Sequence, residues 1–289
     1  MRILVLRGGA LGDFLVTLPA LGLLREHWPD AQIELVGNAT AAALALRAGQ
    51  LNVVHSQHES RWTALYDSSP LPAALATWLG AFDLILCYWP DPDGELARRF
   101  PSRNGQGVLF AGALPTLAPA AAHYCAPLHQ LGLTPRALLY PLRHPKPQGF
   151  QIALHPGSGS PRKNWPLDRW EALAYWLIQD LGASVSVISG PAEPANLFRT
   201  TGEILHCLPL DELADQLAAC RLFIGHDSGV SHLAASTGVP CILLFGPTDP
   251  AMWAPPSPSV RVLRAGDELS AISLAAVQQA VRATLPDQN

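Results

Sequence analysis

The residues best suited to chemistry are a carboxylate, a hydroxyl and an imidazole that lie close together between two apolar segments. Asp227, Ser228 and Gly229 follow the apolar residues 222–224, and His232 comes four residues after Ser228. This order predicts a strand, a turn and a helix, followed by another parallel strand. Free N–H groups at such a helix start favour a phosphate, whereas a carboxylate favours hydroxyl groups. The segment is therefore typical of a site for a nucleotide sugar.

A second polar loop follows another predicted strand at residues 152–155. The loop contains Ser158 and Gly159 and ends with the cation Lys163. Hydroxyl and backbone donors followed by a positive charge suit a diphosphate group. The pattern differs from a P-loop, because no Gly-Lys-Ser/Thr sequence closes it.

A third polar turn follows the first predicted strand, residues 3–6. Its glycines allow a tight turn, and Asp13 is expected in the first turn of a helix at residues 12–28. Two interpretations of Asp13 remain open. The carboxylate could stabilise the helix start through the helix dipole, or it could act on a substrate at the mouth of a cleft.

The sequence gives no argument for a metal site. Asp91 and Asp93 have the D-x-D spacing of metal-dependent sugar transferases, but they stand in a segment rich in Pro and Gly, which favours a turn. The histidines do not show a zinc-binding spacing. We therefore expect a protein without a metal or another cofactor.

Length and composition narrow the class of protein. The chain has 289 residues, of which 49% are apolar and 15% charged, so we expect two globular domains. The formal net charge is −4 and the sequence has no basic stripe, which argues against a nucleic-acid partner. The first apolar segment is too short for a signal peptide, and no apolar run approaches a membrane span. The five cysteines lack C-x-x-C spacing, and we expect all of them to be buried free thiols in a reducing cytoplasm.

The periodicity predicts strands and helices in alternation in each half of the chain, including helices at residues 121–131 and 192–199. The Pro-rich segment 141–149 separates the halves and is expected to be a linker. We therefore predict α/β domains at residues 1–145 and 150–289, both doubly wound, with a cleft between the carboxyl ends of their sheets.

With these segments in view, the sequence resembles glycosyltransferase family 9, the ADP-heptose:lipopolysaccharide heptosyltransferases. The resemblance runs in order from Met1 to about Trp253 and rests on several short motifs. They are Leu11-Gly12-Asp13, Thr17-Leu18-Pro19-Ala20-Leu21, Lys163-Asn164-Trp165-Pro166 with Trp170, Gly190-Pro191-Ala192-Glu193, Asp227-Ser228-Gly229 with His232, and Phe245-Gly246-Pro247-Thr248.

The resemblance implies a GT-B fold, in which two Rossmann-like domains face each other across a cleft. It implies inverting, metal-independent transfer of a heptose or related sugar from an ADP-sugar to a lipopolysaccharide-core or other glycan acceptor. Asp13 would be the base in the N-terminal, acceptor-binding domain. Ser158 and Lys163 would hold the donor diphosphate. The remaining donor contacts would come from Glu193, Asp227, Ser228, Gly229 and His232.

Some residues depart from the family's pattern, and they keep other functions open. His226 stands before Asp227 where a small or amide residue is usual, and the N-terminal half is shorter than is typical. The sequence therefore leaves open an acceptor that is not part of lipopolysaccharide. His155 and His226 also keep open an epimerase or hydrolase of nucleotide sugars with the same fold. A non-catalytic nucleotide-sugar-binding module is a third alternative. For a transferase, we expect a glycan or lipid-linked acceptor and peripheral contact with the inner face of the cytoplasmic membrane.

Overall fold

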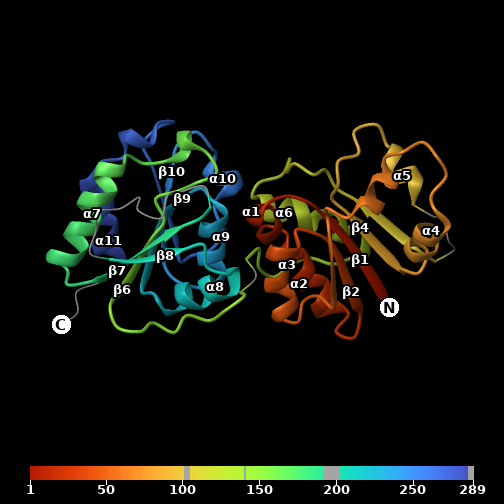
Figure 1. Ribbon diagram of the computed structural model, residues 1–289, viewed down its shortest axis with the longest axis horizontal. Coiled ribbons are helices and arrows are strands. Elements are labelled where there is room, and N and C mark those ends of the chain that lie inside the picture. Colours follow the sequence, from red (N-terminus) through yellow and green to blue (C-terminus); the bar gives the residue numbers. More distant parts are fainter. Residues whose placement is uncertain (101–104, 140, 192–201, 286–289) are drawn as a thin grey trace. The chain divides into compact units, whose positions relative to one another are not determined.

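The computed structural model describes residues 1–100, 105–139, 141–191 and 202–285. The chain divides into two compact units, Met1–Tyr140 and Pro141–Asn289. Each unit contains one parallel sheet with helices on both faces (Figure 1).

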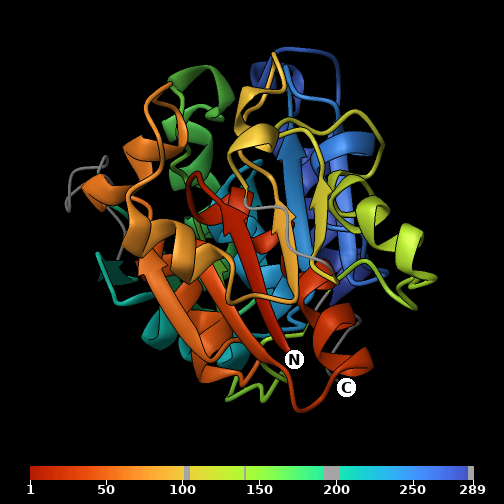
Figure 2. The same ribbon diagram turned by 90° about the vertical axis from the view of Figure 1, so that its right-hand side faces the viewer.

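The N-terminal unit has a five-stranded sheet in the order β3-β2-β1-β4-β5. Figure 2 shows the red strand β1 between the orange strands on one side and the yellow strands on the other. The strands are β1 (Arg2–Arg7), β2 (Gln32–Gly37), β3 (Val53–Ser56), β4 (Leu84–Cys87) and β5 (Gly107–Phe110). The α-helices are α1 (Leu11–Leu15), α2 (Leu18–His27), α3 (Ala39–Arg47), α4 (Ala73–Leu79), α5 (Glu95–Arg99) and α6 (Ala120–Cys125). Two 3₁₀ helices are η1 (Ser60–Leu65) and η2 (Ala126–Leu131).

The C-terminal unit has a six-stranded sheet in the order β11-β10-β9-β6-β7-β8. The strands are β6 (Gln151–Leu154), β7 (Ser184–Ser189), β8 (Glu203–His206), β9 (Leu222–His226), β10 (Cys241–Phe245) and β11 (Val260–Arg264). The α-helices are α7 (Leu167–Gln179), α8 (Leu210–Ala219), α9 (Gly229–Ser236), α10 (Pro250–Trp253) and α11 (Leu274–Thr284). The short 3₁₀ helices are η3 (Pro161–Lys163) and η4 (Leu269–Ala271).

Apolar side chains on both sheet faces form the cores that fix these elements. In the C-terminal unit, α7 and α11 pack against one face of the sheet, and Trp165 and Trp170 are fully buried there (Figure 1). In the N-terminal unit, η1, α4 and α5 cover one face of the sheet. Strands buried on both faces are continuous apolar runs, which explains why their positions follow directly from the sequence.

Two predicted helices are broken in the structure, in each case next to a proline. Residues 12–28 form α1 and α2, because Pro19 lacks an N–H and is placed at the start of the second helix. Residues 121–131 form α6 followed by the 3₁₀ helix η2, whose first turn contains Pro127. A further predicted helix, residues 192–199, lies outside the described residues.

The Pro-rich segment 141–149 belongs to the C-terminal unit instead of standing apart as a linker. Leu142 donates its N–H to Ser236 O, and Lys146 and Gln148 donate theirs to Ala218 O and Ala219 O. These bonds hold the segment against the ends of α8 and α9.

The expectation that all five cysteines are buried is wrong for Cys207. Its side chain is exposed just after β8, while the other four are buried. All five are free thiols. Burial raises the pKa of the Cys87, Cys125 and Cys220 thiols to about 12, so they stay protonated at neutral pH.

Within the described ranges, the helices are too short or too polar for any of them to cross a lipid bilayer.

Candidate active site

Two of the predicted polar loops start side by side in the C-terminal unit. Strands β6 and β9 are neighbours in the sheet, although the elements from η3 and α7 to α8 separate them in the sequence. The direction in which the chain adds strands reverses between them, and such a switch point is the usual ligand-binding position of a parallel α/β sheet. The loop after β6 contains Ser158, Gly159 and Lys163, and the turn after β9 contains Asp227 and Ser228.

Lys163 and Asp227 form an ion pair between the two loops. Lys163 Nζ lies 2.7 Å from Asp227 Oδ2, and their side chains are 30% and 11% exposed. The pair explains why a carboxylate is compatible with a phosphate site, since the neighbouring ammonium offsets its charge. The ammonium has three N–H donors, so it can hold Asp227 and a ligand oxygen together.

Two buried histidines hold the loops in position. His226 Nε2 accepts the N–H of Trp165 at 2.9 Å, and His226 Nδ1 lies 3.3 Å from Gly157 O. His155 Nδ1 lies 3.3 Å from Ser228 Oγ. Burial lowers the pKa of His226 to about 4, and burial with the nearby His226 lowers the pKa of His155 to about 3. Both imidazoles are therefore neutral at pH 7 and link the loops as hydrogen-bonding groups.

Ser158 and Gly159, the other predicted site residues of the loop after β6, differ in how closely they are packed. Ser158 Oγ lies 2.7 Å from both Ser160 O and Asn164 Oδ1, so its hydroxyl shapes the loop before any ligand binds. Gly159 is open, and a Cβ added there would meet no atom within 4 Å.

The turn after β9 leads directly into α9. Ser228 is the N-cap, and its Oγ accepts the N–H of Ser231 at 3.4 Å. Gly229 is the first helical residue, and His232 is buried one turn later. The first N–H groups of α9 therefore begin beside the Lys163–Asp227 pair. Glu193, the remaining predicted donor contact, lies outside the described residues.

Asp13 lies in the N-terminal unit, in the first turn of α1. Its Oδ2 accepts the N–H of Ala10 at 2.9 Å, and its Oδ1 lies 3.3 Å from an Arg7 guanidinium nitrogen. The side chain is still 42% exposed. The carboxylate therefore stabilises the helix start and also presents an edge to solvent, so the two interpretations from the sequence are compatible.

Sequence reasoning missed Arg7, which is only 4% exposed. Besides Asp13, its guanidinium contacts Thr17 Oγ1 at 3.1 Å and the Tyr124 hydroxyl at 3.0 Å, and it lies over the Tyr124 ring. Arg7 therefore orients the Asp13 carboxylate. The available signal was a charged residue directly after the apolar run at residues 3–6.

The D-x-D segment is a turn, as its composition suggested. Asp91 accepts the N–H groups of Leu96 and Ala97 at 2.9 and 3.0 Å, and Asp93 accepts that of Glu95 at 3.1 Å. Within the part of the chain that the structure describes, no group of three or more His, Cys, Asp or Glu side chains could hold a metal ion.

Comparison with known proteins assigns the family. Residues 141–280 match the model of glycosyltransferase family 9 (heptosyltransferase). The chain belongs to glycosyltransferase family 9. It is 26% identical to lipopolysaccharide heptosyltransferase 1 of Escherichia coli O18:K1:H7, with 96% of each chain covered. It is also 26% identical to lipopolysaccharide heptosyltransferase 2 of E. coli K12, with 91% of this chain and 88% of the relative covered.

Solved structures of this family share the fold. A family 9 glycosyltransferase from Veillonella parvula superposes with a TM-score of 0.79 at 22% identity, covering 98% of this chain and 96% of the other. E. coli heptosyltransferase WaaC with ADP gives a TM-score of 0.74 at 20% identity, covering 99% and 100%. The two Rossmann-like units are thus those of a GT-B-type fold, and the chain is an enzyme of the heptosyltransferase family.

Proposed function

We propose that this enzyme transfers a heptose, or a closely related sugar, from an ADP-sugar to a hydroxyl of a lipopolysaccharide-core or other glycan. The Lys163–Asp227 pair at the β6/β9 switch point carries the proposal, because it offers one group for phosphate and one for sugar or ribose hydroxyls. A family 9 structure with ADP and another with ADP-2-deoxy-2-fluoro heptose support this donor class.

In the proposed reaction, each unit has one task. The N-terminal unit, Met1–Tyr140, binds the acceptor, and Asp13 takes the proton from the acceptor hydroxyl as that oxygen attacks the anomeric carbon. The C-terminal unit, Pro141–Asn289, binds the donor. Direct attack by the hydroxyl inverts the anomeric configuration.

The departing diphosphate is stabilised by groups of the chain itself. Lys163, the backbone of the Ser158–Gly159 loop and the first N–H groups of α9 are the donors, with Gly229 allowing close approach. Ser228, His232 and Glu193 complete the proposed donor site. These donors supply the charge stabilisation that a divalent cation supplies in D-x-D enzymes, so the proposed transfer is metal-independent.

The buried histidines argue against the alternative of an epimerase or hydrolase. His155 and His226 have strongly lowered pKa values, and their ring nitrogens hold the loops. They are poor proton donors to a sugar at neutral pH. We further propose a cytoplasmic enzyme that meets a lipid-linked acceptor at the inner face of the membrane.

Product analysis tests the function. The protein is incubated with ADP-heptose, with and without a lipopolysaccharide-core oligosaccharide or other glycan, and ADP and heptosylated glycan are quantified. Transfer predicts equal amounts of both, only when the glycan is present. ADP release without glycan would show hydrolysis, and donor binding without turnover over a broad glycan panel would show a binding module; either result rejects the proposal.

A further inference from the structure

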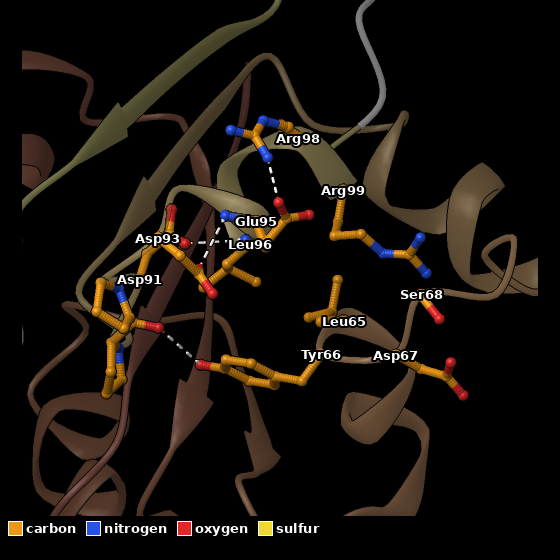
Figure 3. A pocket seen from close by; sticks show the side chains of 12 residues that line it. Leu65, Tyr66, Asp67, Ser68, Asp91, Asp93, Glu95, Leu96, Arg98 and Arg99 are labelled. Atoms are coloured by element: carbon orange, nitrogen blue, oxygen red, sulfur yellow. Dashed lines mark hydrogen bonds and ion pairs between the residues drawn. The ribbon is translucent and has the colours of Figure 1, made fainter.

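The N-terminal unit has its own pocket beside the carboxyl end of β4, with a volume of about 660 Å³. Two chain segments line it, residues 65–68 at the end of η1 and residues 90–99 around the start of α5 (Figure 3). The apolar side chains of Leu65 and Leu96 are surrounded by the polar side chains of the other lining residues. The size suits one or two sugar rings.

One wall of the pocket is an exposed aromatic ring. Tyr66 is 58% exposed, and its ring stacks on that of Trp89 with centroids 6.2 Å apart and an interplanar angle of 23°. Its hydroxyl donates to Pro90 O at 3.3 Å (Figure 3). Contacts at the ring face and at the hydroxyl therefore fix the position of the ring. A fixed aromatic face with a polar edge is suited to the C–H face of a sugar ring.

The polar side chains of the pocket are mainly acceptors. The lining contains four carboxylates and two guanidinium groups, which gives it a formal charge of −2. Asp67 and Asp93 each use one oxygen for a nearby backbone N–H, from Ser69 and Glu95 respectively. The second oxygen of each carboxylate can accept a hydroxyl or an ammonium hydrogen from a ligand.

Both guanidinium groups of the pocket already have partners. Arg98 pairs with Glu95, and Arg99 donates to Ala64 O and Ser69 O. An anionic ligand would have to displace these contacts and enter a negatively charged lining. Uncharged and amino sugars meet neither obstacle.

Trp89, which stacks on Tyr66, connects the pocket wall with the turn that carries Asp13. A Cβ added at Gly8 would lie 3.5 Å from Trp89 Nε1, so the indole that supports Tyr66 borders this turn. The next residue, Gly9, donates its N–H to Gln57 Oε1 at 3.1 Å and stands four residues before Asp13. A sugar on Tyr66 would therefore belong to a molecule that extends toward the Asp13 carboxylate.

We propose that this pocket binds a sugar residue of the acceptor and selects sugars that carry no carboxylate or phosphate. This inference rests on the proposed transferase function and deepens it by giving the class of acceptor. It places the specificity in Tyr66, Asp67 and Asp93, outside the catalytic and donor-binding residues.

The test uses three glycosides that share one ring and differ in charge. Methyl glucoside, methyl glucosaminide and methyl glucuronide are titrated into the full-length protein and followed by saturation-transfer NMR. We expect the glucoside and glucosaminide to bind at least about fivefold more tightly than the glucuronide, with a difference that shrinks as salt is added. ADP binding is measured by calorimetry on the same samples, so that failure of the donor site is seen separately.

Matched variants test whether the glycosides bind in this pocket. Tyr66→Ala should weaken glucoside binding by about tenfold and leave ADP binding unchanged, whereas Tyr175→Ala, which removes a similarly exposed tyrosine from α7, should change neither. Asp67→Asn with Asp93→Asn keeps the backbone contacts and should remove most of the preference against the glucuronide. The proposal fails if no glycoside binds, if the glucuronide binds as well as the glucoside, or if Tyr66→Ala has no effect.

Discussion

Lys163 is one of only two lysines in the chain, and its ammonium is held 2.7 Å from Asp227. We predict that Lys163→Ala weakens ADP binding about 10- to 100-fold, because a charge-assisted contact to phosphate contributes roughly 1.5–3 kcal/mol. Calorimetry measures the change. The matched control is Lys146→Ala, which removes the other, exposed lysine and should leave affinity unchanged. Equal dissociation constants for Lys163→Ala and the unmodified protein would remove Lys163 from the donor site.

Asp13 permits a substitution that separates chemistry from folding. Asp13→Asn retains a side-chain oxygen for the Ala10 N–H but removes the proton acceptor. We predict a loss of transfer rate of about 10²- to 10⁴-fold, with ADP affinity and thermal stability nearly unchanged. Single-turnover kinetics with ADP-heptose provide the measurement. Near-normal turnover would reduce Asp13 to a residue that stabilises a helix start.

The buried histidines should make stability depend on pH. Their folded-state pKa values, about 4 for His226 and about 3 for His155, lie below the ordinary value near 6.5. The unfolded chain therefore takes up protons first, and stability falls as pH drops from about 6.5 toward 4. We expect a loss on the order of 3 kcal/mol per fully buried histidine over that interval.

Urea unfolding followed by tryptophan fluorescence, at pH 7.5, 6.0 and 5.0, measures this dependence. His226→Gln, which does not titrate, should be less stable at pH 7.5 but show a weaker decrease with acidification. A variant with the same pH dependence as the unmodified protein would contradict the assigned role of His226.

At the residue scale, the sequence indicated the polar loops because hydroxyl, glycine and charged residues interrupt apolar strands. It could not indicate Arg7 or Tyr124, whose contact joins residues 117 positions apart. It also could not separate the two roles of Asp13, because the same carboxylate serves the backbone and faces solvent. Such features depend on tertiary contacts, which spacing does not encode.

At the element scale, the stability of the C-terminal unit depends on close packing around the chain that follows β10. A Cβ on Gly246, which follows β10, would lie 2.9 Å from the backbone oxygen of Asp267 and 2.5 Å from Leu269 Cδ1. We predict that Gly246→Ala destabilises the protein by about 1–3 kcal/mol. Gly159→Ala is the matched control, since the added methyl group has open space, and it should stay within about 0.5 kcal/mol. Denaturant midpoints of the two variants decide the point, and similar midpoints would contradict the packing argument.

The inner strands β1, β4, β9 and β10 followed from the sequence because each contains a short, continuous apolar run that the sheet buries on both faces. Helix ends were harder to predict, since apolar spacing continued through Pro19 and Pro127 while the backbone could not. The segment 141–149 has no periodicity, and only its hydrogen bonds to α8 and α9 show that it belongs to the C-terminal unit.

At the scale of the whole molecule, ligands should reveal the division of tasks between the units. We predict that ADP at 100 times its dissociation constant raises the free energy of unfolding by about 2.7 kcal/mol. Thermal-shift measurements with ADP, UDP, GDP and CDP identify the preferred base. Hydrogen exchange should slow in residues 155–163 and 226–236. Slowing confined to the sheet of the N-terminal unit would overturn the assignment of the donor to the C-terminal unit.

The alternation of strands and helices was sufficient to predict two doubly wound α/β units, because each βαβ repeat has few alternative topologies. The acceptor class could not follow from the same pattern. It depends on a pocket formed by residues 65–68 and 90–99, which come together only when η1 and α5 pack beside β4.

The Lys163–Asp227 contact also bears on how the enzyme works among other cellular anions. The fold holds Asp227 beside the ammonium at a high effective concentration, so any anion that reaches Lys163 must share it with this carboxylate. Free phosphate or sulfate can use the remaining N–H donors of Lys163, but the neighbouring carboxylate repels its charge. A nucleotide sugar can satisfy both groups at once, with a phosphate oxygen for the lysine and a hydroxyl for the aspartate. The ion pair thus favours a ligand that carries both groups over simple anions.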